Sequence, residues 1–205
     1  MFCFEDSTVE GRILSVADGP STFNLEMRAA GFNVTSVDLR YRLDKAEILD
    51  EFEKSYAENR DYFYEHPEDF SFKTSRDIEA LLAARRSTFH LFLQDFDENP
   101  TRYVFGELPK LQFADDSFDV CLCANLLFLF DDLLDIEFHL KSIYEMLRVS
   151  RRVQVFPVYG RGHLPVSCHL QAVLQKLAEI GIHHELKPSR YKVWNGESAY
   201  LTLNR

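Results

Sequence analysis

The sequence predicts a doubly wound α/β fold with a mostly parallel sheet, helices on both faces and an antiparallel C-terminal hairpin strand. Short apolar strand patterns alternate with helical patterns along most of the 205 residues, as in a parallel sheet covered on both sides. Near the C-terminus, two strand patterns follow each other around the turn-rich Trp194-Asn195-Gly196. The length suits one domain. We therefore expect residues 1–205 to form a single domain.

The first elements form a compact βαβ unit. Arg12–Val16 is a short apolar strand, and Ser21–Ala30 has the pattern of a helix. Pro20 suits the helix start because its fixed φ is already helical, and Gly31 suits the left-handed residue that ends a helix. Asn33–Val37 is the second strand and is followed directly by Asp38.

Residues 42–100 interrupt this alternation. Leu43–Arg60 and a longer segment starting at Ser75 carry apolar side chains at helical spacing. Because α/β connections usually have two to six residues, we predict a helical insertion between strands 2 and 3. These helices look too short to close a core of their own, so we expect them to dock over the ligand-binding end of the sheet.

The alternation resumes after Pro100. The remaining expected strands are Tyr103–Phe105, Phe118–Ala124, Arg152–Val158, His183–Lys187 and Ala199–Leu203. The remaining expected helices are Ile136–Leu147 and Pro165–Ile180.

Composition excludes several classes of protein. The net charge of −10 repels polyphosphate, which makes nucleic acid an improbable partner. No window has the roughly 18 apolar residues of a membrane helix, and the N-terminus lacks a secretory pattern. The four cysteines form no disulfide framework, so a cytoplasmic protein is expected. Cys121 and Cys123, like His183 and His184, lack further ligands nearby and predict no metal site.

The first turn and the end of the second strand are the expected ligand site, because open α/β sheets bind ligands at the carboxyl ends of their strands. The turn contains Ala17-Asp18-Gly19, and Asp38 lies nineteen positions after Gly19. A carboxylate there accepts two ribose hydroxyls. Alternatively, Asp38 caps a helix or a turn, and the spacing alone leaves both readings open.

A second segment carries a family resemblance. Gly106-Glu107, Leu108-Pro109, Phe113 and Asp116-Ser117-Phe118-Asp119 resemble the corresponding stretch of class I S-adenosylmethionine-dependent methyltransferases. With the first turn, the second strand and the residues from His139 to Val158, the resemblance covers roughly two thirds of the chain. Residues 42–100 lie outside it.

The resemblance implies S-adenosylmethionine as cofactor and gives each matching residue a role. Ala17, Asp18 and Gly19 would let the backbone approach the methionine part, and Asp38 would bind the ribose. Glu107 would stand near the adenine amino group, with Leu108 packed beside the ring. Asn125 and Leu126 would face the methionine end and the substrate.

The first turn departs from the family pattern, which reads acidic-x-Gly-x-Gly-x-Gly. Here Ser15 replaces the acidic residue, Ala17 the first glycine and Ser21 the third. We predict that Asp18 takes over the charged role lost at Ser15. The alternative is a catalytically silent module that binds the cofactor for regulation or interaction.

Methyl transfer asks for little besides alignment of the acceptor with the sulfonium methyl group. No catalytic residue follows from the sequence, although Asn125 and His163 are candidates and His139 is expected to pack. We expect a methyltransferase acting on a small molecule or a protein side chain. A nicotinamide dehydrogenase is a third reading, disfavoured by the antiparallel hairpin and the lack of a second domain. The oligomeric state is not indicated.

Overall fold

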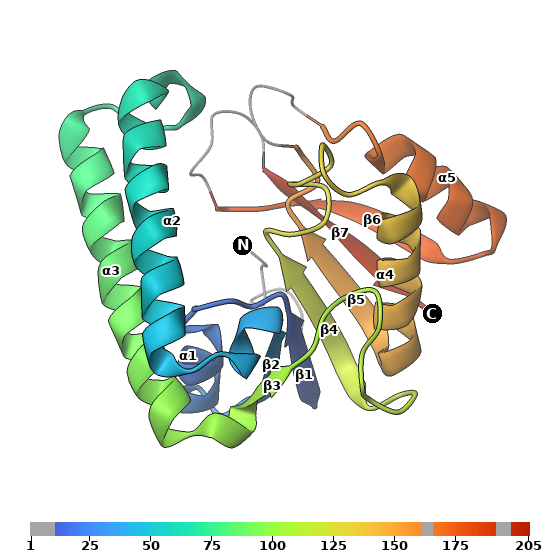
Figure 1. Cartoon of the computed structure of the whole chain (residues 1–205). Helices are drawn as coiled ribbons and strands as arrows, with labels where there is room; N and C mark the ends of the chain where they lie inside the picture. The colour runs from blue at the N-terminus through green and yellow to red at the C-terminus, as the bar shows by residue number, and fades with distance from the viewer. Residues whose placement is uncertain (1–10, 161–165, 192–197) are drawn as a thin grey trace.

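A seven-stranded sheet forms the centre of the protein (Figure 1). The computed structural model describes residues 11–160, 166–191 and 198–205. The strand order is β3-β2-β1-β4-β5-β7-β6. The strands are β1 (Arg12–Val16), β2 (Asn33–Asp38), β3 (Tyr103–Phe105), β4 (Phe118–Ala124), β5 (Ser150–Phe156), β6 (His183–Pro188) and β7 (Ala199–Asn204).

The pairing confirms the predicted fold class. β1 pairs in parallel with both β2 and β4, and β2–β3 and β4–β5 are also parallel. β7 runs antiparallel to β5 and to β6. The chain winds outward from β1 to β3 and starts again at β4 on the other side of β1, so the order reverses between β1 and β4. Such a switch point is where open α/β sheets bind ligands.

Alternate residues of the strands pack under helices on opposite faces. Ile13 belongs to a cluster covered by α1 (Phe23–Ala29). Its neighbour Leu14 belongs to the main core, which includes residues of α4 (Ile136–Val149) and α5 (Leu170–Glu179). Helices therefore cover both faces, as predicted.

Several element boundaries differ from the prediction, and α2 (Lys45–Glu65), described below, also begins two residues late and ends five residues late. α1 begins two residues late, at Phe23. β5 starts and ends two residues early because Ser150 pairs with the first residue of β4 and Phe156 with its last. α5 begins at Leu170 rather than Pro165. The predicted start at Pro165 lies outside the described residues; Cys168 and His169 form a turn in which the Leu170 N–H donates to the Ser167 carbonyl (3.2 Å).

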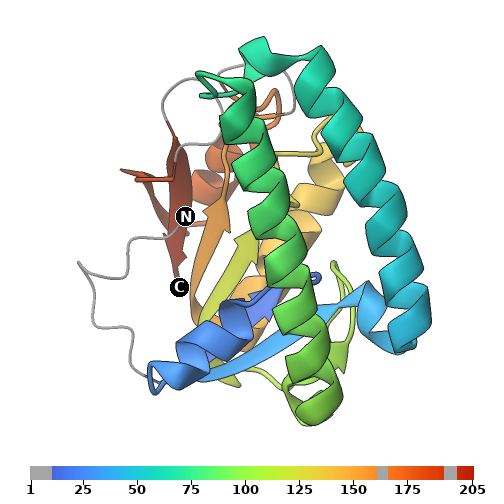
Figure 2. The ribbon, with the colours of Figure 1, turned by 90° about the vertical axis from the view of Figure 1, so that its left-hand side faces the viewer.

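Two long helices form a hairpin in the connection between β2 and β3 (Figures 1 and 2). They are α2 (Lys45–Glu65) and α3 (Ser75–Glu98). Each begins with a capping box, from Asp44 with Glu47 and from Thr74 with Asp77, which satisfies the free N–H groups of the first turn. Short 3₁₀ helices lie at Leu39–Arg42, Pro67–Asp69 and Pro100–Arg102.

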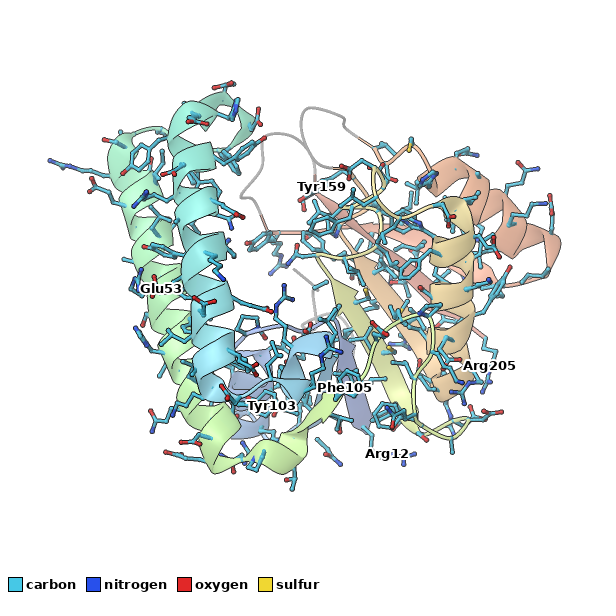
Figure 3. The ribbon with its side chains drawn as sticks, viewed as in Figure 1. Arg12, Glu53, Tyr103, Phe105, Tyr159 and Arg205 are labelled. Atoms are coloured by element: carbon cyan, nitrogen blue, oxygen red, sulfur yellow. The ribbon has the colours of Figure 1, made fainter. Side chains whose placement is uncertain are left out.

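The hairpin contains two apolar clusters. The base cluster joins it to the sheet, since Tyr41 and Tyr103 pack there with Ile48, Phe89, Phe92 and Leu93; Tyr103 is labelled in Figure 3. The distal cluster consists of Phe63, Phe70, Ile78 and Leu82 and lies wholly within the hairpin. The expectation that these helices cannot build a core of their own is therefore wrong for the distal half. Aromatic side chains bury enough area to close a small core between two helices.

None of the helices in the described ranges has the length and apolar character needed to cross a membrane. Cys121 and Cys123 lie inside the sheet core, and burial raises the pKa of the Cys123 thiol to about 12.

Candidate active site

A cleft of about 480 Å³ opens at the carboxyl ends of the central strands. Seven residues predicted to bind the cofactor line it: Ala17, Gly19, Asp38, Glu107, Leu108, Asn125 and Leu126. They come from the last residue of β2 and from the loops after β1, β3 and β4, so the predicted residues gather around the switch point. Asp18 does not line the cleft.

Of the two readings of Asp38, the structure confirms the capping role, and the ribose role remains a prediction that the position of its side chain permits. Its side chain is only 5% exposed and lines the cleft. Oδ2 accepts a hydrogen bond from the Gly19 N–H (3.0 Å), and Oδ1 accepts one from the Arg40 N–H (2.9 Å). The second bond caps the 3₁₀ helix Leu39–Arg42. Since each carboxylate oxygen has two acceptor positions, this carboxylate retains capacity for two ligand hydroxyls.

The backbone around the cleft adopts left-handed conformations at several loop positions. Gly19 has φ +56°, Ala17 +54° and Asn125 +57°. Ala17 and Asn125 bear side chains, and this conformation costs such residues roughly 1–2 kcal/mol. Unfavourable backbone angles of this kind concentrate at ligand sites held by surrounding structure. Here neighbouring strand ends hold the loops, because the Asp18 N–H bonds the Val37 carbonyl (3.2 Å) and the Asn125 N–H the Phe156 carbonyl (2.7 Å).

Gly106 brings the loop after β3 close to β2. A Cβ atom at this position would lie 2.9 Å from Cγ1 of Val37. A side chain would therefore push this loop away from Asp38, whose carbonyl accepts the Gly106 N–H (3.4 Å). Glycine is therefore required at position 106 for a steric reason.

One wall of the cleft is apolar. It combines the loop after β3 with the loop after β4 and the start of α4, and its side chains are Leu108, Leu111, Leu126, Phe130, Leu133, Leu134 and Phe138. Glu107 is exposed at its edge. An apolar wall with a few polar groups is typical of small-molecule sites. The sequence analysis missed the contribution of α4, because Phe138 reads as an ordinary apolar position on an amphipathic helix.

The structure corrects the expected position of Asp18. Its carboxylate accepts hydrogen bonds from Ser36 and from Ser21 (3.0 Å) and interacts with Ser15. These serines belong to β1, β2 and the start of the α1 region, so Asp18 joins the first turn to the sheet. Burial raises the pKa of this carboxyl to about 6. Ser15, which is buried, thus pairs with the half-buried Asp18, and neither residue is among those that line the cleft.

Of the two histidines considered for catalysis in the sequence, the structure describes His139 but not His163. His139 is buried, accepts the Phe128 N–H at Nε2 (3.0 Å), and its Nδ1 contacts the Asp135 carbonyl (2.7 Å). These contacts fix a neutral ring with the proton on Nδ1, and desolvation lowers the pKa of the ring. His139 thus positions the loop after β4. His163 lies outside the described residues.

Tyr41 connects the cleft to the helical hairpin. Its hydroxyl donates to the Gly19 carbonyl (2.7 Å). Its ring packs against Phe92 and Phe96 of α3, with centroid distances of 6.1 Å and 5.7 Å. The base of the hairpin therefore supports the loop that shapes the cleft.

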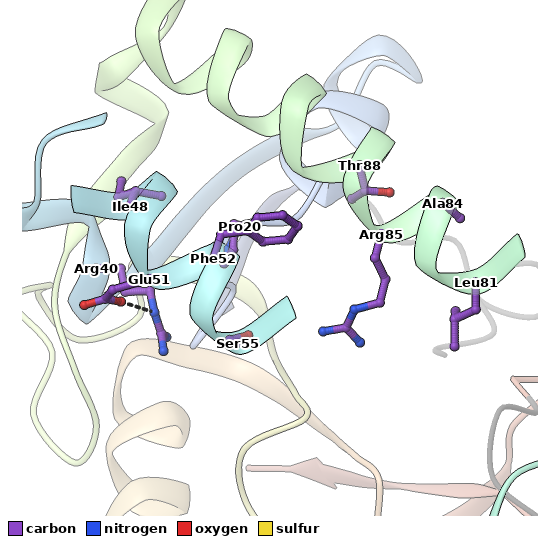
Figure 4. Close-up of a pocket in the computed structure, with 10 residues that line it drawn as sticks. All are labelled: Pro20, Arg40, Ile48, Glu51, Phe52, Ser55, Leu81, Ala84, Arg85 and Thr88. Atoms are coloured by element: carbon purple, nitrogen blue, oxygen red, sulfur yellow. Dashed lines mark hydrogen bonds and ion pairs between the residues drawn. The ribbon is translucent and has the colours of Figure 1, made fainter. Parts of the chain in front are cut away.

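A second cavity of about 300 Å³ adjoins the cleft (Figure 4). It lies between α2, α3 and Pro20 of the first turn, and Arg40 lines both spaces. Arg40 bonds Glu51 (2.9 Å) and lies 3.7 Å from Asp38. The sequence analysis missed Arg40, although its position two residues after Asp38 is a usable signal.

Comparison with solved structures shows the fold of the class I methyltransferases. The PH0226 protein from Pyrococcus horikoshii superposes with a TM-score of 0.52 at 12% identity, over 98% of this chain and 84% of that protein. A SAM-dependent methyltransferase from Methanosarcina mazei gives 0.50 at 12% identity, over 99% and 96%. The glycopeptide N-methyltransferase MtfA gives 0.51 at 12% identity, over 97% and 85%. Identity this low shows the fold alone.

Comparison at the sequence level gives the family. The uncharacterized protein MJ0045 of Methanocaldococcus jannaschii is 31% identical over 211 residues, which span all of this chain and 90% of that protein. The chain belongs to the same family as MJ0045. No family model matches the sequence.

Proposed function

We propose that the protein binds S-adenosylmethionine in the cleft and transfers its methyl group to a small molecule or a protein side chain. One observation carries this proposal: the predicted ribose carboxylate, Asp38, lies buried in a cleft at the switch point of a methyltransferase-like sheet. The residues present suit the cofactor. Asp38 has acceptor capacity for the ribose hydroxyls, and the apolar wall suits an adenine ring.

The residues of this chain would bind the cofactor and align it with the acceptor. Asp38 would hold the ribose, Leu108 would pack beside the adenine, and Glu107 would face its amino group. The loops at Gly19 and Asn125 would border the methionine end. Bound S-adenosylmethionine supplies an activated methyl group, so the protein contributes mainly alignment of the acceptor.

The helical hairpin would form the acceptor side of the site. Its base supports the Gly19 loop through Tyr41, and the cavity between its helices adjoins the cleft. Hairpin and strand ends together would enclose the acceptor, which favours a small or slender one.

The first turn supports a second candidate, a silent cofactor-binding module. Ser15 has no carboxylate, and the carboxylate of Asp18 is bonded to serines of the first turn and the sheet rather than directed into the cleft, so neither residue would pair with the methionine ammonium group. Such a module would bind the cofactor and its demethylated product without turnover. A dehydrogenase finds no comparable support, because the compared methyltransferases match nearly the whole chain.

Calorimetry with the full chain tests the binding half of the proposal. We expect S-adenosylmethionine and S-adenosylhomocysteine to bind with micromolar affinity and NAD not to bind. Preferred binding of NAD, or no binding of either sulfur ligand, would refute the assignment.

Turnover tests the other half. Incubation with methyl-labelled cofactor and fractionated small molecules or proteins should transfer label and release S-adenosylhomocysteine. Tight binding without label transfer to any fraction would favour the silent module.

A further inference from the structure

Arg85 lies on the inner side of α3 and lines the second cavity. Figure 4 shows its side chain extending from α3 into the space between α2 and Leu81. Within the described part of the chain, its guanidinium makes no hydrogen bond or ion pair. Tyr56 of α2 and Tyr191, which follows β6, are the groups that interact with it electrostatically. Arg85 thus faces both the hairpin and the far strands of the sheet.

The charges lining this cavity leave Arg85 uncompensated. The charged lining residues are Arg40, Glu51 and Arg85. Arg40 and Glu51 form an ion pair at 2.9 Å, which Figure 4 shows as a dashed line. One positive charge therefore remains in the cavity, in a protein whose net charge is −10.

The next residue behaves differently. Arg86 makes two hydrogen bonds to Glu53, at 2.6 Å and 3.0 Å, and its guanidinium lies 4.3 Å from the centre of the Tyr56 ring. The two arginines are adjacent on one helix, yet Arg86 is paired with Glu53 across the solvent-exposed side of the hairpin and Arg85 faces the cavity.

The environment of Arg85 suits an anion. Its side chain is accessible to solvent but set in a concave wall, and partial desolvation by this wall lowers the pKa of the guanidinium. A guanidinium binds carboxylate or phosphate oxygens with two parallel hydrogen bonds. Phe52, Ile48 and Leu81 supply apolar surface in the same cavity, and about 300 Å³ is at the small end of ligand sites.

We propose that Arg85 binds the oxyanion, a carboxylate or a phosphate, of a small acid with an apolar body, and that this acid is the methyl acceptor. The proposal rests on the function proposed above, because the cavity adjoins the cleft through Arg40. The acceptor's charged end is held by α3, its apolar part lies against Phe52, and its reactive group reaches toward the strand ends.

The test is calorimetric titration of benzoate, phenyl phosphate and neutral benzamide into the full chain. Wild type should bind at least one of the two anions ten times more tightly than benzamide. Arg85→Gln should lose ten- to hundred-fold in affinity for that anion, and Arg85→Lys should lose less. Arg86→Gln is the matched control and should bind like wild type. Circular dichroism confirms that each variant is folded.

Several outcomes would overturn the proposal. These are equal binding of anions and benzamide by wild type, unchanged anion affinity in Arg85→Gln, or an equal loss in Arg86→Gln. A loss of S-adenosylmethionine affinity in Arg85→Gln without loss of anion affinity would place Arg85 in the cofactor site instead. If wild type binds the anion through Arg85 but binds no S-adenosylmethionine, the proposed function fails and the acceptor role fails with it, while the anion site stands.

Discussion

The cleft at the sheet and the helical hairpin beside it are built in different ways. The cleft consists of strand ends and short loops whose positions follow from the strand order, and several of its residues resemble the pattern of the class I methyltransferases. The hairpin fills an unusually long connection and carries an aromatic core of its own. A common sheet points to a cofactor, whereas the distinctive hairpin is where selection of the acceptor would reside. The two regions meet in the base cluster, around Tyr41.

The largest expected difference between the cleft and the distal hairpin is in the effects of replacing two buried phenylalanines. Phe92→Ala and Phe70→Ala each remove a side chain at most 2% exposed and should lower the free energy of unfolding by about 3–5 kcal/mol. Phe92 packs against Tyr41, so its loss should also weaken cofactor binding. Phe70 lies in the distal cluster, so its loss should leave cofactor affinity unchanged. Urea denaturation and calorimetry measure both effects; equal cofactor affinities in the two variants would show that the hairpin does not support the cleft.

A second pair of variants concerns carboxylates that both cap helices. Asp38 lines the cleft, whereas Asp44 caps α2 outside it. Asp38→Ala should weaken S-adenosylmethionine binding by about 1.5–3 kcal/mol, because charged hydrogen bonds to the ribose are lost. Asp44→Ala should lower stability by about 1 kcal/mol without changing affinity. Unaltered affinity in a folded Asp38→Ala protein would remove the ribose assignment.

The raised pKa of Asp18 in the first turn predicts that the stability of the folded protein depends on pH. Its pKa is about 6 in the folded protein against an ordinary value of 3.8, so the fold favours its protonated form. Its stabilising contribution is complete below pH 3.8 and is lost as the pH rises through 6. An asparagine at this position does not ionise, so Asp18→Asn should gain about 3 kcal/mol of stability relative to wild type between pH 4 and pH 7, at about 1.4 kcal/mol for each unit of pKa change.

Chemical denaturation at a series of pH values measures this difference. A difference between variant and wild type that stays constant with pH would contradict the burial of the charge. A ten- to hundred-fold loss of S-adenosylmethionine affinity in Asp18→Asn would instead restore the predicted contact with the ammonium group.

The smallest expected effect is at Ala17, where the family pattern has glycine. Ala17→Gly removes the steric strain that a side chain causes in the left-handed conformation, but glycine loses more conformational entropy on folding than alanine does. The net gain in stability should be about 0.5 kcal/mol, measurable by urea denaturation. A destabilised variant would show that the methyl group of Ala17 makes contacts that outweigh the strain.

The two regions also differ in how far the sequence predicts them. The mostly parallel sheet, its antiparallel C-terminal strand and the position of Asp38 follow from local patterns and from rules for parallel sheets. The capping box at Asp44 was also visible in the sequence, yet the helix was predicted to begin at Leu43. By contrast, nothing local distinguishes Arg85 from Arg86, because their difference depends on Glu53, thirty-three residues away from Arg86. Asp18 was misplaced for the same reason, since Ser36 reaches it from another strand.

Hydrogen–deuterium exchange of the full chain, with and without S-adenosylmethionine, tests the central claim most directly. Binding in the cleft should slow exchange in the segments around Gly19, Asp38, Glu107 and Asn125, while the distal hairpin around Phe70 exchanges as before. Protection confined to the hairpin, or none in these four segments at saturating cofactor, would contradict a cofactor site at the switch point of the sheet.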